Sequence, residues 1–164
     1  MGTGKSSVGR LISDLLHFSF VDTDDLIESR AGISISEIFA REGEPAFRGL
    51  ERRLVEELAQ RRKTVISAGG GLPANAANLA SLKTHSLVVC LWASPEKIWE
   101  RVRNQSHRPL LNGLDPPGKI RGLLAEREPF YRQADVLINT DSRPIREVAQ
   151  QVILQFQIAQ ASHR

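Results

Sequence analysis

Gly4, Lys5 and Ser6 are the first residues in the chain whose types and spacing could do chemistry. They end the pattern G-x-x-x-x-G-K-[ST], in which backbone N–H groups surround phosphate oxygens, the lysine contacts the transferred phosphate and the hydroxyl holds Mg²⁺. A helix is expected to begin here, and a helix N-terminus attracts anions. The predicted residues of this phosphate site are Gly2, Thr3, Gly4, Lys5, Ser6 and Ser7.

The opening of this phosphate loop would lie before Met1, because the full pattern puts its first glycine two positions upstream. The strand that leads into such a loop has no counterpart either. In a doubly wound sheet that strand is central, so without it the neighbouring strands keep unpaired backbone groups. We therefore expect a start codon assigned too far downstream, which the in-frame genomic codons would test. We also expect weak nucleotide binding by the 164-residue chain, because a shortened loop has fewer N–H donors.

Two aspartates follow the next apolar segment. Residues 18–21 predict a strand, so Asp22 and Asp24 lie at its carboxyl end, where α/β sheets bind ligands. Because side chains alternate along a strand, both aspartates can face the same side. One can then lie nearer a metal ion and the other nearer the hydroxyl group that would accept a phosphate. Helix capping by Thr23 or Asp24 is the structural alternative. Beside a phosphate loop we favour the functional interpretation, with Ser6 and Asp22 as the metal-binding pair.

Three consecutive glycines, Gly69, Gly70 and Gly71, follow a second predicted strand at Thr64–Ser67. Glycines let the backbone approach a ligand closely and expose its N–H donors. A flexible turn is the alternative, but a glycine triplet is an entropically costly way to make a turn. We therefore predict that the triplet belongs to a binding site.

Short β-type segments alternate with longer helical ones, which predicts an α/β fold with a parallel β-sheet flanked by helices on both faces. Strands are expected at 18–21, 64–67, 87–92 and 136–139, and the apolar segment 87–92 is expected to be buried on both faces. Helices are expected over 8–16, from 23, around 35–39, between 43 and 63, from 94 through 102, up to 132, and from 144. With three prolines and two glycines, residues 107–118 are predicted to form a mobile loop.

Composition excludes several classes of function. A chain of 164 residues with 41% apolar residues favours one domain. Its 22 basic and 19 acidic residues are interspersed, which argues against a nucleic-acid-binding surface. A single cysteine, Cys90, excludes an internal disulfide and favours a cytoplasmic setting. The longest apolar run, 87–93, is far shorter than the ~20 residues of a membrane-spanning helix, so no membrane partner is expected.

Six elements resemble the shikimate kinase family in their order and spacing. They are Met1–Gly9, Asp22-Thr23-Asp24, Phe47-Arg48 with Glu51, Ser67–Gly71, Arg108–Leu111 and Tyr131-Arg132. The resemblance runs to about Val152 and lacks only the first strand and the opening of the phosphate loop. It implies a fold like that of P-loop nucleoside-monophosphate kinases and transfer of a phosphate from ATP, with Mg²⁺, to the 3-hydroxyl of shikimate in aromatic amino-acid biosynthesis. We expect a monomeric kinase domain over 1–164, with a substrate-binding helical region at about 23–62 and a lid at about 107–118.

The resemblance also implies roles on the acceptor side. Arg48 is similar to the arginine that binds the shikimate carboxylate, a role that suits a guanidinium fork. Glu51, three residues on, would orient Arg48, and an ordinary surface pair is the alternative. Phe39 and Phe47 are similar to the aromatic residues that flank the substrate ring, although core packing would also explain them. Gly70 is similar to a glycine that contacts shikimate.

Further roles implied by the resemblance concern arginines and the reacting groups. Arg132 is similar to a second carboxylate-binding arginine, whereas we interpret Arg127 as structural. Arg108 resembles a lid arginine that reaches the ATP phosphates on closure, and Arg101 resembles one that stacks on adenine. Asp24 would hydrogen-bond the acceptor hydroxyl and accept its proton, although phosphoryl transfer depends more on positioning than on a strong base. The predicted catalytic residues are Lys5, Asp24 and Arg108.

Two other functions stay open on the sequence. Another small-molecule P-loop kinase, such as a gluconate or nucleoside-monophosphate kinase, would share the phosphate loop but lack the combined Asp-Thr-Asp, Phe-Arg-x-x-Glu and Ser-x-Gly-Gly-Gly set. A non-catalytic ligand-binding module would have no need of Lys5 and Asp24 together. An ATPase assay with and without shikimate separates the three.

Overall fold

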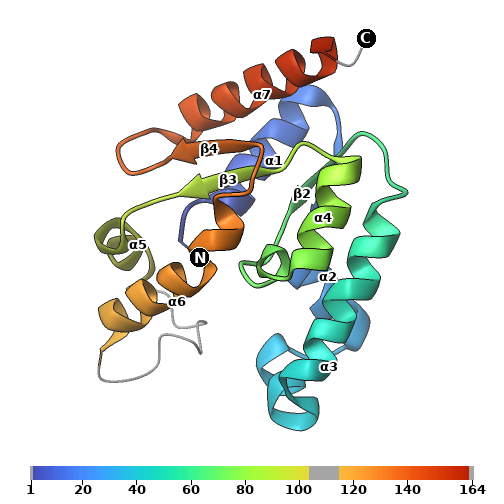
Figure 1. Ribbon diagram of the computed structural model, residues 1–164, viewed down its shortest axis with the longest axis vertical. Coiled ribbons are helices and arrows are strands. Elements are labelled where there is room, and N and C mark those ends of the chain that lie inside the picture. The colour runs from blue at the N-terminus through green and yellow to red at the C-terminus, as the bar shows by residue number, and fades with distance from the viewer. Residues whose placement is uncertain (1, 104–114, 163–164) are drawn as a thin grey trace.

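The computed structural model describes residues 2–103 and 115–162 of the chain. Figure 1 shows short strands among longer helices, with the phosphate loop leading into the first helix. The elements in chain order are α1 (Lys5–Leu16), β1 (Ser19–Asp22), α2 (Thr23–Ala31), α3 (Ile35–Leu58), β2 (Thr64–Ser67), the 3₁₀ turn η1 (Leu72–Ala74), α4 (Ala76–His85), β3 (Val89–Trp92), α5 (Pro95–Val102), α6 (Pro116–Tyr131), β4 (Val136–Asn139) and α7 (Ile145–Ser162).

The described strands form two parallel pairs. β1 pairs with β2, with Asp22 opposite Ser67, and β3 pairs with β4, with Trp92 opposite Asn139. The predicted parallel pairing is therefore confirmed. The strands form two separate pairs because no described strand joins β2 to β3, as the sequence predicts for a sheet whose central strand has no counterpart. Asp22 and the turn after Ser67 leave the same end of the β1–β2 pair, which brings the acidic segment and the glycine triplet together.

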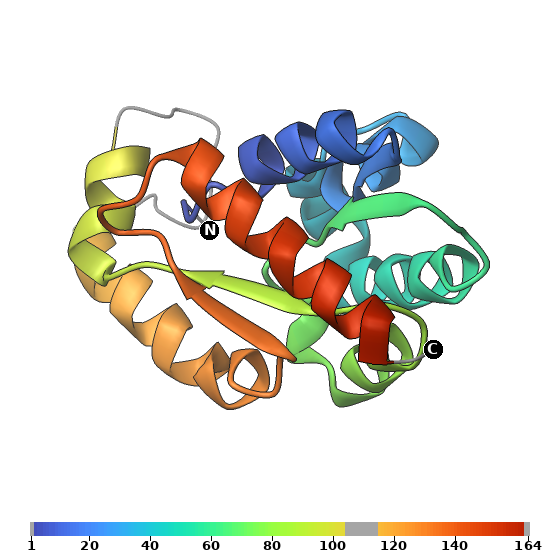
Figure 2. The same ribbon diagram turned by 90° about the horizontal axis from the view of Figure 1, so that it is seen from above.

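Helices cover both sides of the strands. On one side, α1 and α7 pack against each other and share a core with β3 and β4 that includes Val8, Ile12, Ile138 and Val148. Figure 2 shows α4 and α6 on the opposite side of the strands from α1. Two further apolar cores lie between α2, α3 and β1, and between α5 and α6. The α/β fold with helices on both faces is confirmed.

Local backbone chemistry fixes the elements around the site. Gly4 has φ 86°, a left-handed conformation that glycine adopts readily, and it directly precedes α1. Asp22 caps α2, since its side chain accepts a hydrogen bond of 3.1 Å from the Asp24 N–H. Gly43 interrupts α3 with φ 80° and ψ 172°, so the two helical faces predicted before and after it belong to two helical parts that meet at a kink.

Three details differ from the sequence-based expectations. Strand β3 is not buried on both faces, because alternate side chains face away from the α1–α7 layer and leave Trp92 47% exposed. Residues 116–118 belong to the first turn of α6 rather than to a loop, because Asp115 accepts a hydrogen bond from the Gly118 N–H at 2.9 Å and caps the helix. Helix α4 was not predicted, since its apolar residues are not periodic; Asn75 caps it.

No helix in the described ranges is long and apolar enough to cross a membrane.

Candidate active site

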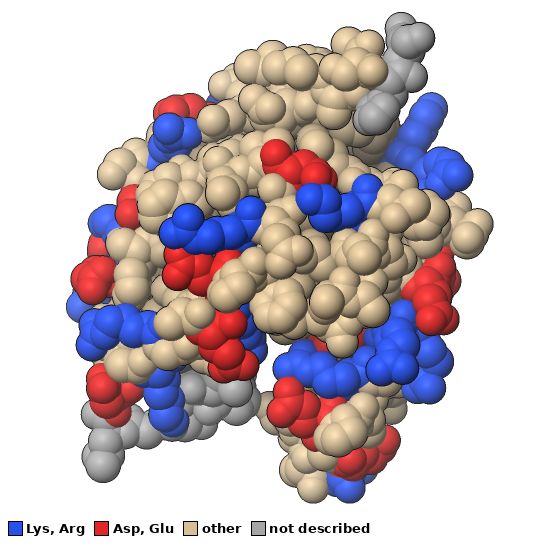
Figure 3. All heavy atoms as spheres, in the orientation of Figure 1, with Lys and Arg blue, Asp and Glu red and all other residues tan. Residues whose placement is uncertain are grey.

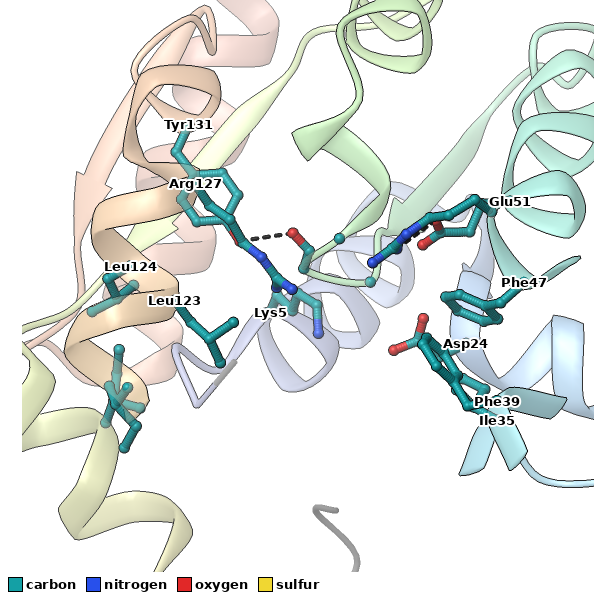
Figure 4. A pocket seen from close by; sticks show the side chains of 16 residues that line it. Lys5, Asp24, Ile35, Phe39, Phe47, Glu51, Leu123, Leu124, Arg127 and Tyr131 are labelled. Atoms are coloured by element: carbon teal, nitrogen blue, oxygen red, sulfur yellow. Dashed lines mark hydrogen bonds and ion pairs between the residues drawn. The ribbon is translucent and has the colours of Figure 1, made fainter. Parts of the chain in front are cut away.

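A cavity of about 180 Å³ opens between the side of the molecule that carries α3 and the side that carries α6. Figure 3 shows the surface hollowed between these two sides. In Figure 4, Asp24, Phe39, Phe47 and Glu51 lie across the cavity from Leu123, Arg127 and Tyr131, with Lys5 between the two groups. Side chains that are far apart in the sequence therefore face one space, which we call the acceptor cavity.

Asp24 reaches the acceptor cavity from the first turn of α2. Burial raises the pKa of its carboxyl group, Lys5 opposes that shift, and the neighbouring Asp22 adds to it. The carboxylate lies against the glycine triplet, where a Cβ on Gly69 would come within 2.1 Å of the Asp24 Oδ1 atom. A larger residue at position 69 would therefore displace the end of the Asp24 side chain from this place.

Arg48 projects from α3 into the same cavity and is held by two carboxylates. Its Nη1 atom donates to Glu51 at 2.7 Å and its Nη2 atom donates to Glu44 at 2.7 Å. Glu51 is only 2% exposed, and burial raises the pKa of its carboxyl group although Arg48 acts in the opposite direction. Glu51 is therefore a buried group that fixes Arg48 rather than an ordinary surface partner. A Cβ on Gly71 would lie 2.3 Å from the Arg48 Nη1 atom, so a larger residue there would displace the guanidinium.

Two aromatic side chains form one wall of the acceptor cavity. The ring centroids of Phe39 and Phe47 are 4.9 Å apart, with the rings tilted by 41°. Phe47 is 5% exposed and also belongs to the apolar core, whereas Phe39 is 37% exposed. One ring therefore packs in the core while the pair lines the cavity, and contact with a substrate ring stays a prediction.

The opposite wall comes from α6 and differs from the sequence-based prediction. Arg127 and Tyr131 line the acceptor cavity, and the Tyr131 hydroxyl donates a hydrogen bond of 2.7 Å to the Gly70 carbonyl oxygen. Arg132 does not line it. Its side chain is 73% exposed and pairs with Glu128 at 2.6 Å. The structure thus places Arg127, interpreted from the sequence as structural, where Arg132 was expected.

Helical phase explains this exchange of arginines. Ile120, Leu123, Arg127 and Tyr131 recur at spacings of three and four along α6, so they share the face that lines the cavity. Arg132 is five residues after Arg127 and falls outside that face. The spacing is visible in the sequence and shows that Arg127 and Tyr131 share a helix face, but it does not show that this face lines the cavity.

A second cavity, of about 300 Å³, lies over the phosphate loop. It is lined by every described residue predicted for phosphate binding, from Gly2 to Ser7, and Lys5 lines the acceptor cavity as well. Arg101 and Arg143 also line this nucleotide cavity. Arg101 is held by hydrogen bonds to the Thr140 hydroxyl, at 3.1 Å, and to the Thr140 carbonyl oxygen. The predicted adenine-side arginine thus lies at the cavity that the phosphate loop forms.

Oxygen ligands suited to Mg²⁺ lie beside the nucleotide cavity. The Ser6 hydroxyl donates to Asp22 Oδ2 at 2.7 Å and lies 3.2 Å from the Ser67 hydroxyl. Mg²⁺ prefers hard oxygen ligands and commonly uses one or two protein groups with substrate phosphates, so this pair fits the ion. Among the described residues, no group of three or more His, Cys, Asp or Glu side chains could form an all-protein metal site. Asp22 thus combines helix capping with a position next to Ser6.

The predicted lid arginine, Arg108, lies outside the described residues, as do positions 104–114 in general. The other predicted site residues line one of the two cavities, apart from Asp22, which contacts Ser6, and Arg132, which is exposed at the surface.

Comparisons with known proteins agree on one family. The family profile described as shikimate kinase matches residues 1–157. A shikimate kinase of Caldanaerobacter subterraneus subsp. tengcongensis is 44% identical over 153 residues, which is 93% of this chain and 90% of that protein. The solved shikimate kinase from Acinetobacter baumannii in complex with shikimate has a TM-score of 0.90 and 38% identity, covering 98% of this chain and 89% of that one. A gluconokinase from Sinorhizobium meliloti, at 18% identity and TM-score 0.57 over 92% of this chain and 83% of that one, shares only the fold.

Proposed function

The chain belongs to the shikimate kinase family, and we propose that its two cavities hold ATP and shikimate so that the terminal phosphate of ATP passes to the 3-hydroxyl of shikimate. The observation that carries this proposal is that Lys5 lines both cavities. Because Lys5 lies where the two cavities adjoin, its ammonium group can contact the transferred phosphate in the nucleotide cavity. The same group lies near Asp24 in the acceptor cavity. Phosphate and alcohol would therefore meet at Lys5.

Asp24 is the group that orients the acceptor hydroxyl and accepts its proton. It lines the acceptor cavity close enough to Lys5 for that ammonium group to lower its pKa, although burial raises the pKa overall. A raised pKa makes the ionised carboxylate a better proton acceptor. Because the transition state of phosphoryl transfer is loose, aligning the hydroxyl with the phosphate matters more than base strength.

The carboxylate of shikimate is bound by Arg48 from α3 and Arg127 from α6. Among the described lining residues, the cations Lys5, Arg48 and Arg127 outnumber the anions Asp24 and Glu51 by one, which suits a monoanionic acceptor. Glu51 and Glu44 orient the Arg48 guanidinium, so that it is organised before substrate arrives. Arg127 takes the role that the resemblance had suggested for Arg132.

The glycine triplet presents backbone to the acceptor. The Gly69 N–H donates to the Thr23 hydroxyl at 2.8 Å, so it is already used within the protein. Within the described ranges, no acceptor is seen for the Gly70 N–H, which leaves this donor for a hydroxyl of shikimate. Phe39 and Phe47 supply the apolar wall against which the ring of the acceptor packs.

The phosphate loop and Arg101 bind ATP on the other side. Backbone N–H groups of residues 2–7 hold the phosphates, Lys5 contacts the γ-phosphate, and Arg101 provides the adenine-side cation. Ser6, with Asp22 acting through water, would hold Mg²⁺. Charge on the β- and γ-phosphates is neutralised by that ion when it is bound. In this proposal residues 1–164 act as one kinase domain, 23–62 contribute the acceptor-binding helices, and Arg108 stays a prediction.

An ADP-release assay with three acceptor conditions tests the function. The chain is incubated with millimolar ATP and Mg²⁺, and ADP is followed with shikimate, with gluconate, or with no acceptor. We expect ADP release that depends on shikimate and saturates with it. ADP release only with gluconate would identify a different kinase, and shikimate binding without any ADP release would identify a non-catalytic binding module.

A further inference from the structure

The glycine triplet is fixed by hydrogen bonds from two different parts of the chain. The Gly69 N–H donates to the hydroxyl of Thr23, a fully buried residue at the start of α2, at 2.8 Å. The Gly70 carbonyl oxygen accepts from the Tyr131 hydroxyl of α6 at 2.7 Å. The turn therefore connects the α2 side of the acceptor cavity to its α6 side.

The orientation of this turn determines where two site residues can lie. Asp24 packs against Gly69 and Arg48 packs against Gly71 so closely that a Cβ on either glycine would overlap the side chain. A rotation of the turn would therefore displace Asp24 and Arg48 together. Whatever fixes the Gly70 carbonyl fixes the backbone between these two contacts.

Tyr131 also lies beside Arg127. The two residues are one helical turn apart on the cavity face of α6, and Figure 4 shows their side chains next to each other. Burial raises the pKa of the Tyr131 hydroxyl, and the charge and hydrogen bonding of Arg127 oppose that shift. The hydroxyl thus stays protonated at neutral pH, and it can donate to Gly70 while Arg127 lies beside it.

We propose that Tyr131 is a positioning residue for acceptor binding, which holds Arg127 and the glycine triplet in a fixed relation. Its hydroxyl does not need to touch shikimate. The hydroxyl sets the distance between the guanidinium that binds the carboxylate and the backbone that binds the ring hydroxyls. The carboxylate and the ring hydroxyls of shikimate can therefore be bound at the same time. This inference rests on the proposed function.

The substitution Tyr131→Phe tests the inference, because it removes the hydroxyl and keeps the ring. We expect the Kd for shikimate, measured by titration calorimetry without nucleotide, to rise about 3- to 10-fold, as for loss of one positioning hydrogen bond. The KM for ATP is expected to stay within about twofold, because Tyr131 does not line the nucleotide cavity. Thr84→Val is the matched control, since it removes an exposed helical hydroxyl that donates to the Ala80 carbonyl oxygen. An unchanged Kd for shikimate, or equal weakening of shikimate and ATP, would overturn the proposal.

A double-mutant cycle with Arg127→Ala tests whether Tyr131 acts through Arg127. We expect Tyr131→Phe to weaken shikimate binding less in the Arg127→Ala background than in the wild-type chain. Full additivity would show that Tyr131 does not position Arg127 and would overturn that link. A wild-type chain that fails to bind shikimate would contradict the proposed function itself, whereas equal binding by wild type and Tyr131→Phe would overturn only this inference.

Discussion

The two cavities are built in opposite ways. The nucleotide cavity is lined by one continuous segment, residues 2–8, which includes the first turn of α1, together with residues of α5, α7 and the loop between β4 and α7. The acceptor cavity is made from side chains of α2, α3 and α6 around the glycine triplet. A phosphate can be bound by a local backbone shape, whereas a small asymmetric acid alcohol needs charged groups brought together from distant parts of the chain.

The ion pairs of the acceptor cavity also differ in energy from those at the protein surface. On the acceptor side, Arg48 and the buried Glu51 form an ion pair, and removing one partner of such a pair typically costs about 3–5 kcal/mol. Pairs at the surface, such as Arg132 with Glu128, contribute about 0–1 kcal/mol. The acceptor cavity should therefore be sensitive to single side-chain substitutions, and sensitivity should fall steeply at residues that do not face it.

Asp24→Asn should reduce activity more than any other substitution considered for the acceptor cavity. The amide cannot accept the proton of the acceptor hydroxyl, so kcat should fall by about 10²- to 10⁴-fold. The affinity for ATP, measured by titration, should stay unchanged, because Asp24 does not line the nucleotide cavity. The matched control is Asp25→Asn, whose side chain is 70% exposed and pairs with Arg10 at 3.7 Å. A kcat within tenfold of wild type for Asp24→Asn would remove this residue from the chemistry.

The next effect separates two arginines on α6. Arg127→Ala should raise the KM for shikimate by about 10- to 100-fold, because a charge-assisted hydrogen bond to the carboxylate is lost. Arg132→Ala should leave this KM within about twofold, since its side chain is exposed and bonded to Glu128. Steady-state kinetics with varied shikimate measures both. The reverse ranking would show that Arg132, and not Arg127, binds the acceptor.

A smaller effect is expected from a methyl group on the glycine triplet. In Gly71→Ala the new Cβ would displace the end of Arg48, which is held by Glu44 and Glu51, so the Kd for shikimate should rise about 3- to 10-fold. Gly122→Ala on α6 is the control, because nothing lies within 4 Å of its added Cβ. That control should bind shikimate normally and be more stable, as expected for alanine in a helix. Equal shikimate binding by the two variants would argue against the tight contact of Arg48.

The smallest effect is a shift in pH dependence. Burial raises the pKa of Asp24, and the residue must be ionised to accept a proton. Activity should therefore be present above this raised pKa and fall as the pH drops through it, at a higher pH than an ordinary aspartate would give. The acidic limb of kcat/KM for shikimate measures this pKa. A limb at or below the usual aspartate value would contradict the burial of Asp24.

Elements that depend on neighbouring residues could be predicted from the sequence. Contacts between residues far apart in the sequence could be predicted only where a motif indicated them. The phosphate loop, the strands at 64–67 and 136–139 and the α5 helix opened by Ser94 are encoded by neighbouring residues. Arg127 was missed because membership of the cavity depends on the helical phase of α6 against elements far away in sequence. The exposure of Trp92 was missed for a related reason, since an apolar strand does not reveal which of its faces is covered.

The bond between Tyr131 and Gly70 shows the same limit. A tyrosine near the end of a helix and a glycine triplet 61 residues earlier give no signal of contact in one sequence. The contact arises from packing of α6 beside η1, which the topology determines. Positioning residues of this kind become visible only when both ends of the hydrogen bond are placed in space.

Phosphate and alcohol are proposed to meet between Lys5 and Asp24, and the identity of the reaction product is the sharpest test of this arrangement. Phosphorus and proton NMR of a reaction containing ATP, Mg²⁺ and shikimate should show one phosphorylated product, with the phosphate on the 3-hydroxyl and an equal amount of ADP. Inorganic phosphate in place of this product, or a phosphate on another hydroxyl, would contradict the claim, because the acceptor would not be held with that hydroxyl facing Asp24.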